Sequence, residues 1–207
     1  MYVEQKNYFY YITTMNENYE HPPMPKGAED GIIKGMYKLL PAKKPALRLL
    51  GSGSILNESI KAKELLSKYG IESEVWSVTS FNLLRKNGME TERANQLNPT
   101  KKEQKTYVEE CFDDYSIPIV ASTDYMRSYA EQIRPYVKSD YTVLGTDGFG
   151  RSDSRENLRE FFEIDASSIT RAAVYTLFKN KIIDNAQLKE VYDDIEVDPL
   201  KPNPWEV

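Results

Sequence analysis

Hydrophobic positions along this chain form short apolar runs that alternate with amphipathic stretches. The apolar runs lie at residues 32–40, 46–50, 74–80, 117–121 and 141–144 and are rich in β-branched, leucine and aromatic residues. Between them, apolar residues recur at helical spacing, as in Ala62, Leu65, Leu66 and Tyr69. Strands and helices that alternate in this way are typical of an α/β layer fold, so we expect a sheet of five strands covered by helices.

Turn and capping signals set the expected helix ends. Gly70 predicts the end of the helix that follows Ser54, and Asp153 with Glu156 three residues later matches a capping box. Pro118 should confine the fourth apolar run to a strand start or an edge, since proline has no N–H to donate. Further helices are expected over residues 81–97 (broken at Gly88), 107–112, 125–137, 166–179 and 186–195.

The beginning of the chain has a different pattern. Residues 8–15 are aromatic and β-branched, as in a strand, and residues 16–26 contain three prolines, as in an extended linker. We therefore expect a domain boundary here, followed by one α/β domain over residues 27–198 and an extended tail over residues 199–207.

Composition excludes several classes of protein. With 40% hydrophobic and 29% charged residues, the chain is expected to be a soluble globular protein. It has no run near the roughly 18 apolar residues of a membrane span, and its N-terminus lacks a signal pattern, so we expect no membrane association and a cytoplasmic location. The net charge is -5 and no dense basic run is present, which argues against nucleic acid as a partner.

A single cysteine and a single histidine restrict the possible chemistry. Cys111 has no second cysteine for a disulfide, and with His21 it cannot form the usual zinc ligand sets. We expect Cys111 to be a buried, inert thiol rather than a reactive one. His21 lies in the proline-rich linker, which does not favour a Ser-His-Asp or Cys-His catalytic arrangement.

Two glycine-rich segments are candidate anion sites. Gly51-Ser-Gly-Ser54 joins a strand to a helix, a geometry that can cradle phosphate, although these glycines serve equally to let the strand and helix pack closely. In the segment 145–158, GTDGFGRSDSRENL, the alternative to an anion site is a turn with Asp153 as helix cap and arginines paired with carboxylates. The candidate anion-binding residues there are Gly148, Gly150, Arg151, Ser152 and Arg155.

Tyrosines gather near the N-terminus, at Tyr8, Tyr10, Tyr11 and Tyr19. Such clusters suit protein interfaces, because tyrosine buries a large ring while its hydroxyl stays bonded, but a packed core explains them equally well. Carboxylates are plentiful, yet no pair stands apart in a context that indicates acid–base catalysis.

Collinear segments carry a family resemblance: YYITTMNENYEHPPMPKGAEDGIIKGMYKL from Tyr10, LLGSGSIL from Leu49, VWSVTSFNLLRKNG from Val75, VASTDYM from Val120 and VLGTDGFGRSDSRENLREFFEIDA from Val143. Together they resemble the C-terminal end of the homodimeric-type decarboxylating component of pyruvate dehydrogenase complexes, within the thiamine-diphosphate-dependent transketolase superfamily. The resemblance implies a transketolase C-terminal-domain-like fold, a three-layer α/β/α domain with a five-stranded mixed sheet and one antiparallel strand. It also implies that residues 1–26 hold the last strand of a preceding pyrimidine-binding domain and the linker.

The resemblance further implies where the chemistry of the family resides. In that family, thiamine diphosphate and Mg²⁺ sit between the two preceding domains of opposite subunits, and this chain lacks the GDG motif and metal-binding Asn of that site. We therefore expect this chain to have no catalytic residue, metal ligand or bound cofactor, and to be inactive alone. The full-length form would be a homodimer that decarboxylates pyruvate, reductively acetylates lipoyl groups and binds the dihydrolipoyl acetyltransferase core.

Within such an enzyme, this chain is expected to be a structural and dimer-contact domain. Asn16, Glu17 and Asn18 would lie near the mouth of the substrate channel, although they also suit a polar interdomain linker, and we assign His21 no role. From a different class, the alternative is a free-standing α/β module that holds a phosphorylated effector at residues 51–54 or 145–154.

Overall fold

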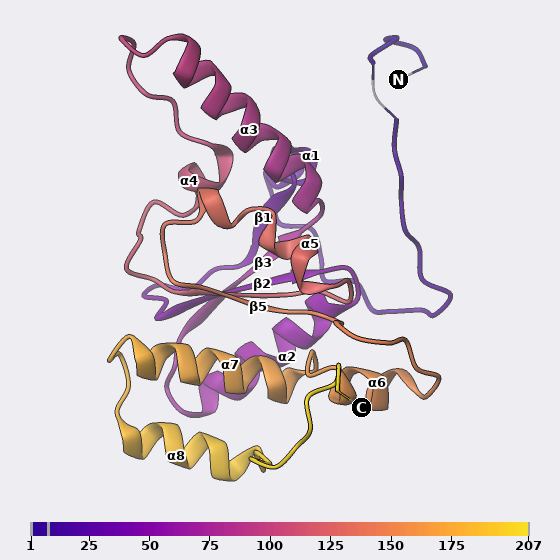
Figure 1. Cartoon of the computed structure of the whole chain (residues 1–207), viewed down its shortest axis with the longest axis vertical. Helices are drawn as coiled ribbons and strands as arrows, with labels where there is room; N and C mark the ends of the chain where they lie inside the picture. The colour runs from indigo at the N-terminus through magenta and orange to yellow at the C-terminus, as the bar shows by residue number, and fades with distance from the viewer. Residues whose placement is uncertain (1, 8, 207) are drawn as a thin grey trace.

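The computed structural model describes residues 2–7 and 9–206, which fold around a five-stranded mixed sheet (Figure 1). The strand order is β1-β3-β2-β4-β5, with β1 pairing antiparallel to β3 and the other neighbours parallel. The expected α/β fold with one antiparallel strand is confirmed. The strands are β1 (Met36–Leu40), β2 (Leu47–Ser52), β3 (Ser73–Val78), β4 (Ile119–Ser122) and β5 (Tyr141–Leu144).

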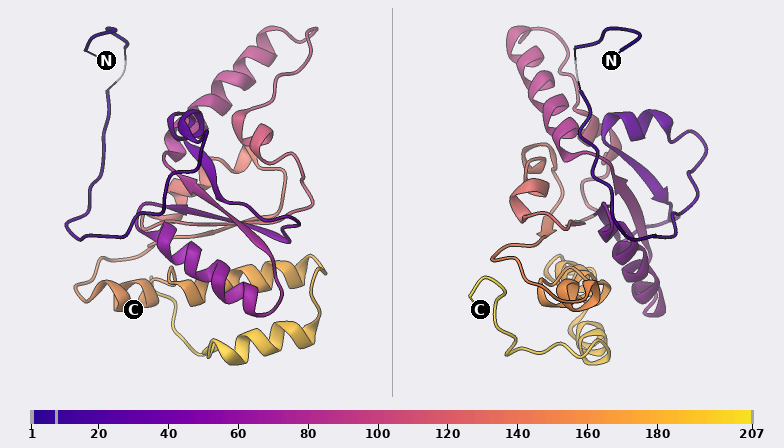
Figure 2. Two further views of the ribbon diagram at one scale, coloured as in Figure 1. Left: turned by 180° about the vertical axis from the view of Figure 1, so that it is seen from behind. Right: turned by 90° about the vertical axis from the view of Figure 1, so that its right-hand side faces the viewer.

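Helices cover both faces of the sheet and complete three layers (Figures 1 and 2). One face carries α3 (Phe81–Leu97), α4 (Tyr107–Cys111) and α5 (Arg127–Glu131), with α1 (Glu29–Lys34) beside the β1 edge. The other face carries α2 (Ile55–Lys68), α6 (Arg155–Phe161) and α7 (Ala166–Lys179), with α8 (Asn185–Asp194) packed beneath α7. Among the described residues, no helix combines the length and the apolar content needed to cross a membrane.

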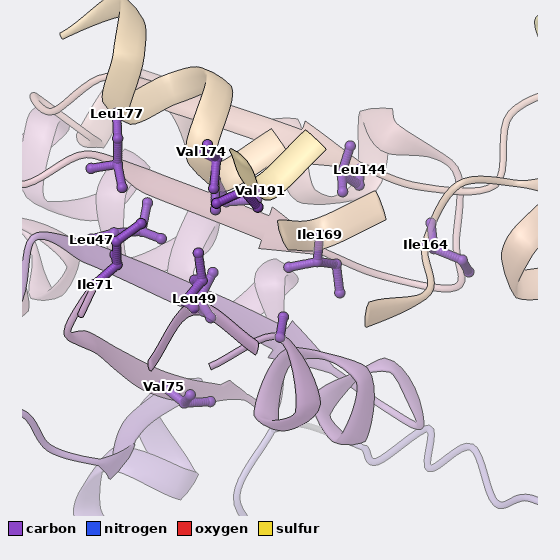
Figure 3. Packing of buried hydrophobic residues seen from close by; sticks show 14 of the residues in the cluster. Leu47, Leu49, Ile71, Val75, Leu144, Ile164, Ile169, Val174, Leu177 and Val191 are labelled. Carbon is purple, nitrogen blue, oxygen red and sulfur yellow. The ribbon is translucent and has the colours of Figure 1, made fainter. Parts of the chain in front are cut away.

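The core is divided in two by the sheet because its central strands are buried on both faces, as parallel strands usually are. Leu49 and Val75 belong to the cluster under α2 and α7, which Figure 3 shows from close by. Leu50 and Trp76, their neighbours along the same strands, belong to the cluster under α3 and α4. This alternation fixes the strand register, since a shift of one residue would exchange the two sets of side chains.

The strand expected over residues 32–40 is wrong in its first half. Residues there form α1, and only β1, from Met36 onward, pairs with β3. Gly35 ends the helix at a φ of 114°, and its N–H donates to the Gly31 carbonyl at 3.0 Å. The left-handed backbone at a glycine therefore separates helix from strand inside one apolar run.

A second correction concerns Gly88 and the helix expected over residues 125–137. Helix α3 runs unbroken through Gly88, where an added Cβ would lie 2.2 Å from Cε2 of Tyr136. The glycine therefore makes room for a ring rather than breaking the helix.

Residues 125–137, expected as one helix, form α5 and a separate 3-10 helix, Arg134–Tyr136, because Pro135 lacks an N–H and disfavours helical backbone before it.

The predicted capping box is also misplaced by one residue. Ser154 is the N-cap of α6, and its Oγ accepts the N–H of Asn157 at 3.2 Å. Asp153 instead accepts from the Asn157 side chain at 2.9 Å, so Glu156 is not at the third helical position. The prediction for Pro118 is confirmed, since it immediately precedes β4 and its carbonyl accepts the N–H of Arg48 at 3.0 Å.

Candidate functional site

The segments singled out from the sequence meet where β2, β4 and β5 end. Strands β2 and β4 are neighbours, yet the chain leaves β2 through α2 toward β3 and leaves β4 through α5 toward β5, on opposite sides. In open α/β sheets, ligands bind outside the carboxyl ends of the strands at such a switch point. Residues 51–54, 122–127 and 145–155 belong to this edge, which we call the carboxyl edge.

At Gly51–Ser54 the contacts favour packing over phosphate binding. A Cβ on Gly51 would lie 2.6 Å from the Cα of Leu56, so the glycine allows the strand and the helix to approach. A carboxylate oxygen of Asp124 lies 3.5 Å from the Ser54 hydroxyl, which donates to it. Burial raises the pKa of Asp124. A carboxylate at this helix start repels an incoming phosphate, and the N-terminal partial charge of α2 already faces an anion.

Two sets of predicted residues come together at Arg155. Its guanidinium donates to the Asn16 side chain and forms an ion pair with Glu17, with Nε to Oε2 at 2.5 Å. Arg155 was expected in an anion site, whereas Asn16 and Glu17 were expected at a channel mouth. Asn18 is exposed. The linker is therefore tied to the start of α6, and the anion that Arg155 binds is a carboxylate of the same chain.

A buried network next to this contact was not found by sequence reasoning. Arg159 donates to the Tyr19 hydroxyl at 2.9 Å and to Glu58 at 3.1 Å. Glu58 is 5% exposed and also accepts the N–H of Ala166 at the start of α7 at 3.1 Å. The available signal was helical spacing, because Glu58 lies four residues before Ala62 on the buried face of α2. This network anchors Tyr19 of the linker to both α2 and α7.

The loop between β5 and α6 is fixed at its base and exposed at its tip. Asp147 accepts the N–H of Arg127 at 3.0 Å, and Trp205 of the tail packs against Gly148, whose φ is 108°. Phe149, at the tip, is 83% exposed.

The remaining candidate anion-binding residues of this loop contact different parts of the chain. The Arg151 guanidinium stacks over the ring of Phe161 at 4.6 Å, whereas Arg155 turns to the linker. Gly150 and Ser152 are exposed. Of the predicted pairing of both arginines with carboxylates, the structure shows the pair for Arg155 and an aromatic contact for Arg151.

The strand expected over residues 8–15 is not formed in the part that the structure describes. Residues 9–15 make an extended arm that leaves the body beside α6 (Figures 1 and 2). Phe9 is 84% exposed, Tyr11 88% and Ile12 77%. Residues 9–15 belong to none of the five strands of the sheet, and Tyr8 lies outside the described residues.

The one cysteine and the one histidine lie in different parts of the fold. Cys111, on α4, is partly buried rather than fully buried as expected, and burial raises the pKa of its thiol, which lowers its thiolate fraction. His21 is exposed on the linker. Among the described residues, no three His, Cys, Asp or Glu side chains gather as metal ligands. At the glycine turn, the Asp124 carboxylate would repel a diphosphate, and within the described residues no group of ligands gathers beside it to hold Mg²⁺, so this turn does not fit a Mg²⁺-diphosphate group.

Comparison with known proteins shows which family this fold matches. Residues 35–165 match the family model of the transketolase-like TK C-terminal domain. The chain is 53% identical, over 97% of its length, to the pyruvate dehydrogenase E1 component of Pseudomonas aeruginosa, and 51% identical, over 97%, to that of Escherichia coli. It spans 23% of the length of each of these relatives.

Solved structures agree on the fold. A transketolase from Pichia stipitis superimposes with a TM-score of 0.53 at 19% identity, covering 75% of this chain and 20% of that one. At this identity the likeness concerns the fold alone. The family match over more than half of the chain leads to one conclusion: the chain belongs to the transketolase-like TK C-terminal domain family.

Proposed function

We propose that this chain works as the C-terminal structural and contact domain of a pyruvate dehydrogenase decarboxylating component. The observation that carries the proposal is its identity of about half to such components over 97% of its length, while it spans 23% of theirs. In that assembly, the full-length homodimer decarboxylates pyruvate and passes acetyl groups to the lipoyl groups of a dihydrolipoyl acetyltransferase core in the cytoplasm. Thiamine diphosphate and Mg²⁺ are bound by the domains that precede this one.

The structure supports a contact role more than a catalytic one. Arg155, at the carboxyl edge, and Arg159, further along α6, fasten the linker through Glu17 and Tyr19. The arm beyond them exposes Phe9, Tyr11 and Ile12, and residues 1–26 are suited to supply the last strand of the preceding domain and the linker from it. In this arrangement, Asn16, Glu17 and Asn18 lie where two domains join, which is where the mouth of a substrate channel is expected.

Two proteins test this proposal. The first is the chain alone, and the second is a hybrid in which it replaces the 205 matched residues of the Escherichia coli relative. With pyruvate, thiamine diphosphate and Mg²⁺, we expect no turnover by the chain and turnover by the hybrid. Pyruvate turnover by the chain alone, or an inactive although folded hybrid, would overturn the proposal.

A further inference from the structure

The loop between β5 and α6 presents one side chain in a manner that packing within this chain does not explain. Phe149 is 83% exposed, although a phenylalanine of a packed loop usually turns inward. It stands between Gly148 and Gly150, which are also exposed. The loop thus carries an exposed aromatic ring at its tip, flanked on both sides by glycines, which have no side chain.

The base of the same loop is held firmly, so the ring is presented from a defined position. The Thr146 N–H donates to the Tyr125 carbonyl at 3.0 Å, and its hydroxyl donates to the Asp124 carbonyl at 2.6 Å. Asp147 accepts the N–H of Arg127 at 3.0 Å, and the Arg127 guanidinium stacks over Trp205 at 5.5 Å. A ring on such a base loses little conformational freedom when it enters a pocket.

The exposed residues of the carboxyl edge, to which Phe149 belongs, have the composition of an interface centre. The loop bonded to residue 146 exposes Met126 by 59% and Tyr125 by 42%, and Arg151 and Arg155 follow Phe149 along the chain. Aromatic residues, methionine and arginine are enriched at the centres of protein interfaces, where lysine and glutamate are depleted. The exposed stripe on α3 differs in that it carries residues of the depleted types, Lys86 and Glu90, beside Arg85, Met89 and Arg93.

We propose that Phe149 is the anchor by which this domain docks on the domain that precedes it in the same polypeptide. The inference rests on the proposed function. The linker supports this occupant because Arg155, at the C-terminal end of the loop, binds Asn16 and Glu17, so the linker toward the preceding domain is fastened to the same loop that carries Phe149. A domain tethered here has a high effective concentration at the ring. The recognition chemistry is an apolar pocket for one aromatic ring, rimmed by carboxylates or carbonyls for Arg151.

The hybrid enzyme and the isolated chain together test the anchor by hydrogen exchange of the backbone amides of residues 147–151. In the hybrid these amides should exchange more slowly than in the isolated chain. Phe149→Ala should speed their exchange in the hybrid on the order of 30-fold, the effect of losing an interface hot spot, and leave the thermal midpoint of the isolated chain unchanged. Phe149→Leu should give an intermediate effect, and the matched control Leu97→Ala, at a residue 62% exposed on α3, none.

The alternative outcomes separate this inference from the function on which it rests. An active hybrid whose Phe149→Ala variant exchanges like the parent would overturn the anchor and leave the proposed function standing. A folded hybrid without activity would overturn both. If the isolated chain self-associates on size-exclusion chromatography and Phe149→Ala abolishes this, the occupant is a second copy, and the proposal of the preceding domain is wrong.

Discussion

The two ends of the chain are both irregular, yet one packs on the body and the other does not. In the tail, Pro204 is buried, Trp205 stacks with Arg127 at 5.5 Å, and the Lys201 ammonium donates to the Glu160 carbonyl at 2.7 Å. In the N-terminal arm, Phe9, Tyr10 and Tyr11 are exposed, and residues 9–15 form no strand. Composition alone therefore does not decide whether an irregular terminal segment docks.

The difference lies in whether a receiving surface exists within the chain. The tail meets a shallow site formed by Gly148, where a side chain would crowd Trp205, and by the Arg127 guanidinium. The linker is fastened where Glu17 and Tyr19 meet Arg155 and Arg159. In the arm before it, large apolar side chains are exposed to water, a pattern typical of a binding surface.

Arg159→Ala is the substitution expected to change stability most, and it tests whether the linker is anchored at Tyr19. The change removes a cationic partner from Glu58, whose side chain is 6% exposed, and releases Tyr19. Because the N–H of Ala166 and the ammonium of Lys61 still bond Glu58, we expect a loss of about 2 kcal/mol in the free energy of unfolding, measured with urea.

Arg155→Ala is the matched control, because its ion pair with Glu17 is largely exposed and should be worth at most about 0.5 kcal/mol. Equal losses in the two variants would contradict the view that the linker is anchored at Tyr19 rather than along its whole length.

A smaller effect is expected at the docked end. Trp205→Ala removes a half-exposed ring and its contact with Arg127, so the free energy of unfolding should fall by about 1 kcal/mol. Leu200→Ala, at a tail residue 88% exposed, should change it by less than about 0.5 kcal/mol. If Trp205→Ala changes the free energy of unfolding as little as Leu200→Ala does, the packing of the tail contributes no measurable stability and the comparison with the arm fails.

Most of the sheet could be predicted from apolar runs, because strands buried on both faces are continuous in sequence. The errors in predicting helix and strand bounds occurred at glycines, because a glycine can serve different structural purposes. Gly35 separates a helix from a strand inside one run, and Gly88 admits the ring of Tyr136, which lies 48 positions further along the chain. A glycine needed for a distant side chain has no local signature.

The candidate site was predictable in its parts but not in its pairing. Arg155 and Glu17 were each singled out, yet 138 positions separate them, and only the fold brings them together. Spacing alone could have placed Glu58 on the buried face of α2, but not beside Arg159. Asp124 escaped notice because a single carboxylate after a strand is common; only the register of β2 against β4 sets it against Ser54.

The titration of Asp124 probes the carboxyl edge, where this carboxyl group contacts Ser54. Burial raises its pKa above the ordinary value of 3.8, while the nearby charge of Arg159 lowers it. A carboxyl group whose pKa is higher in the folded state favours folding when protonated, and that contribution is lost as the pH rises through the folded-state pKa.

Asp124→Asn should therefore be more stable than the parent at pH 7, by up to about 0.5 kcal/mol, and the gap should close as the pH falls into the acid range. Urea unfolding at a series of pH values measures this. A gap that widens on acidification would mean that the carboxylate is stabilised in the folded chain.

The smallest expected effect belongs to the arm itself. Removal of residues 2–12 deletes several exposed aromatic side chains but leaves Glu17 and Tyr19 in place. Because these rings are not buried on this body, the free energy of unfolding should change by less than about 0.5 kcal/mol, while concentration-dependent aggregation, followed by light scattering, should decrease. A loss above about 1 kcal/mol would mean that the arm packs on its own domain as the tail does. In the hybrid enzyme the same deletion should instead abolish activity, since there the arm has a preceding domain to complete.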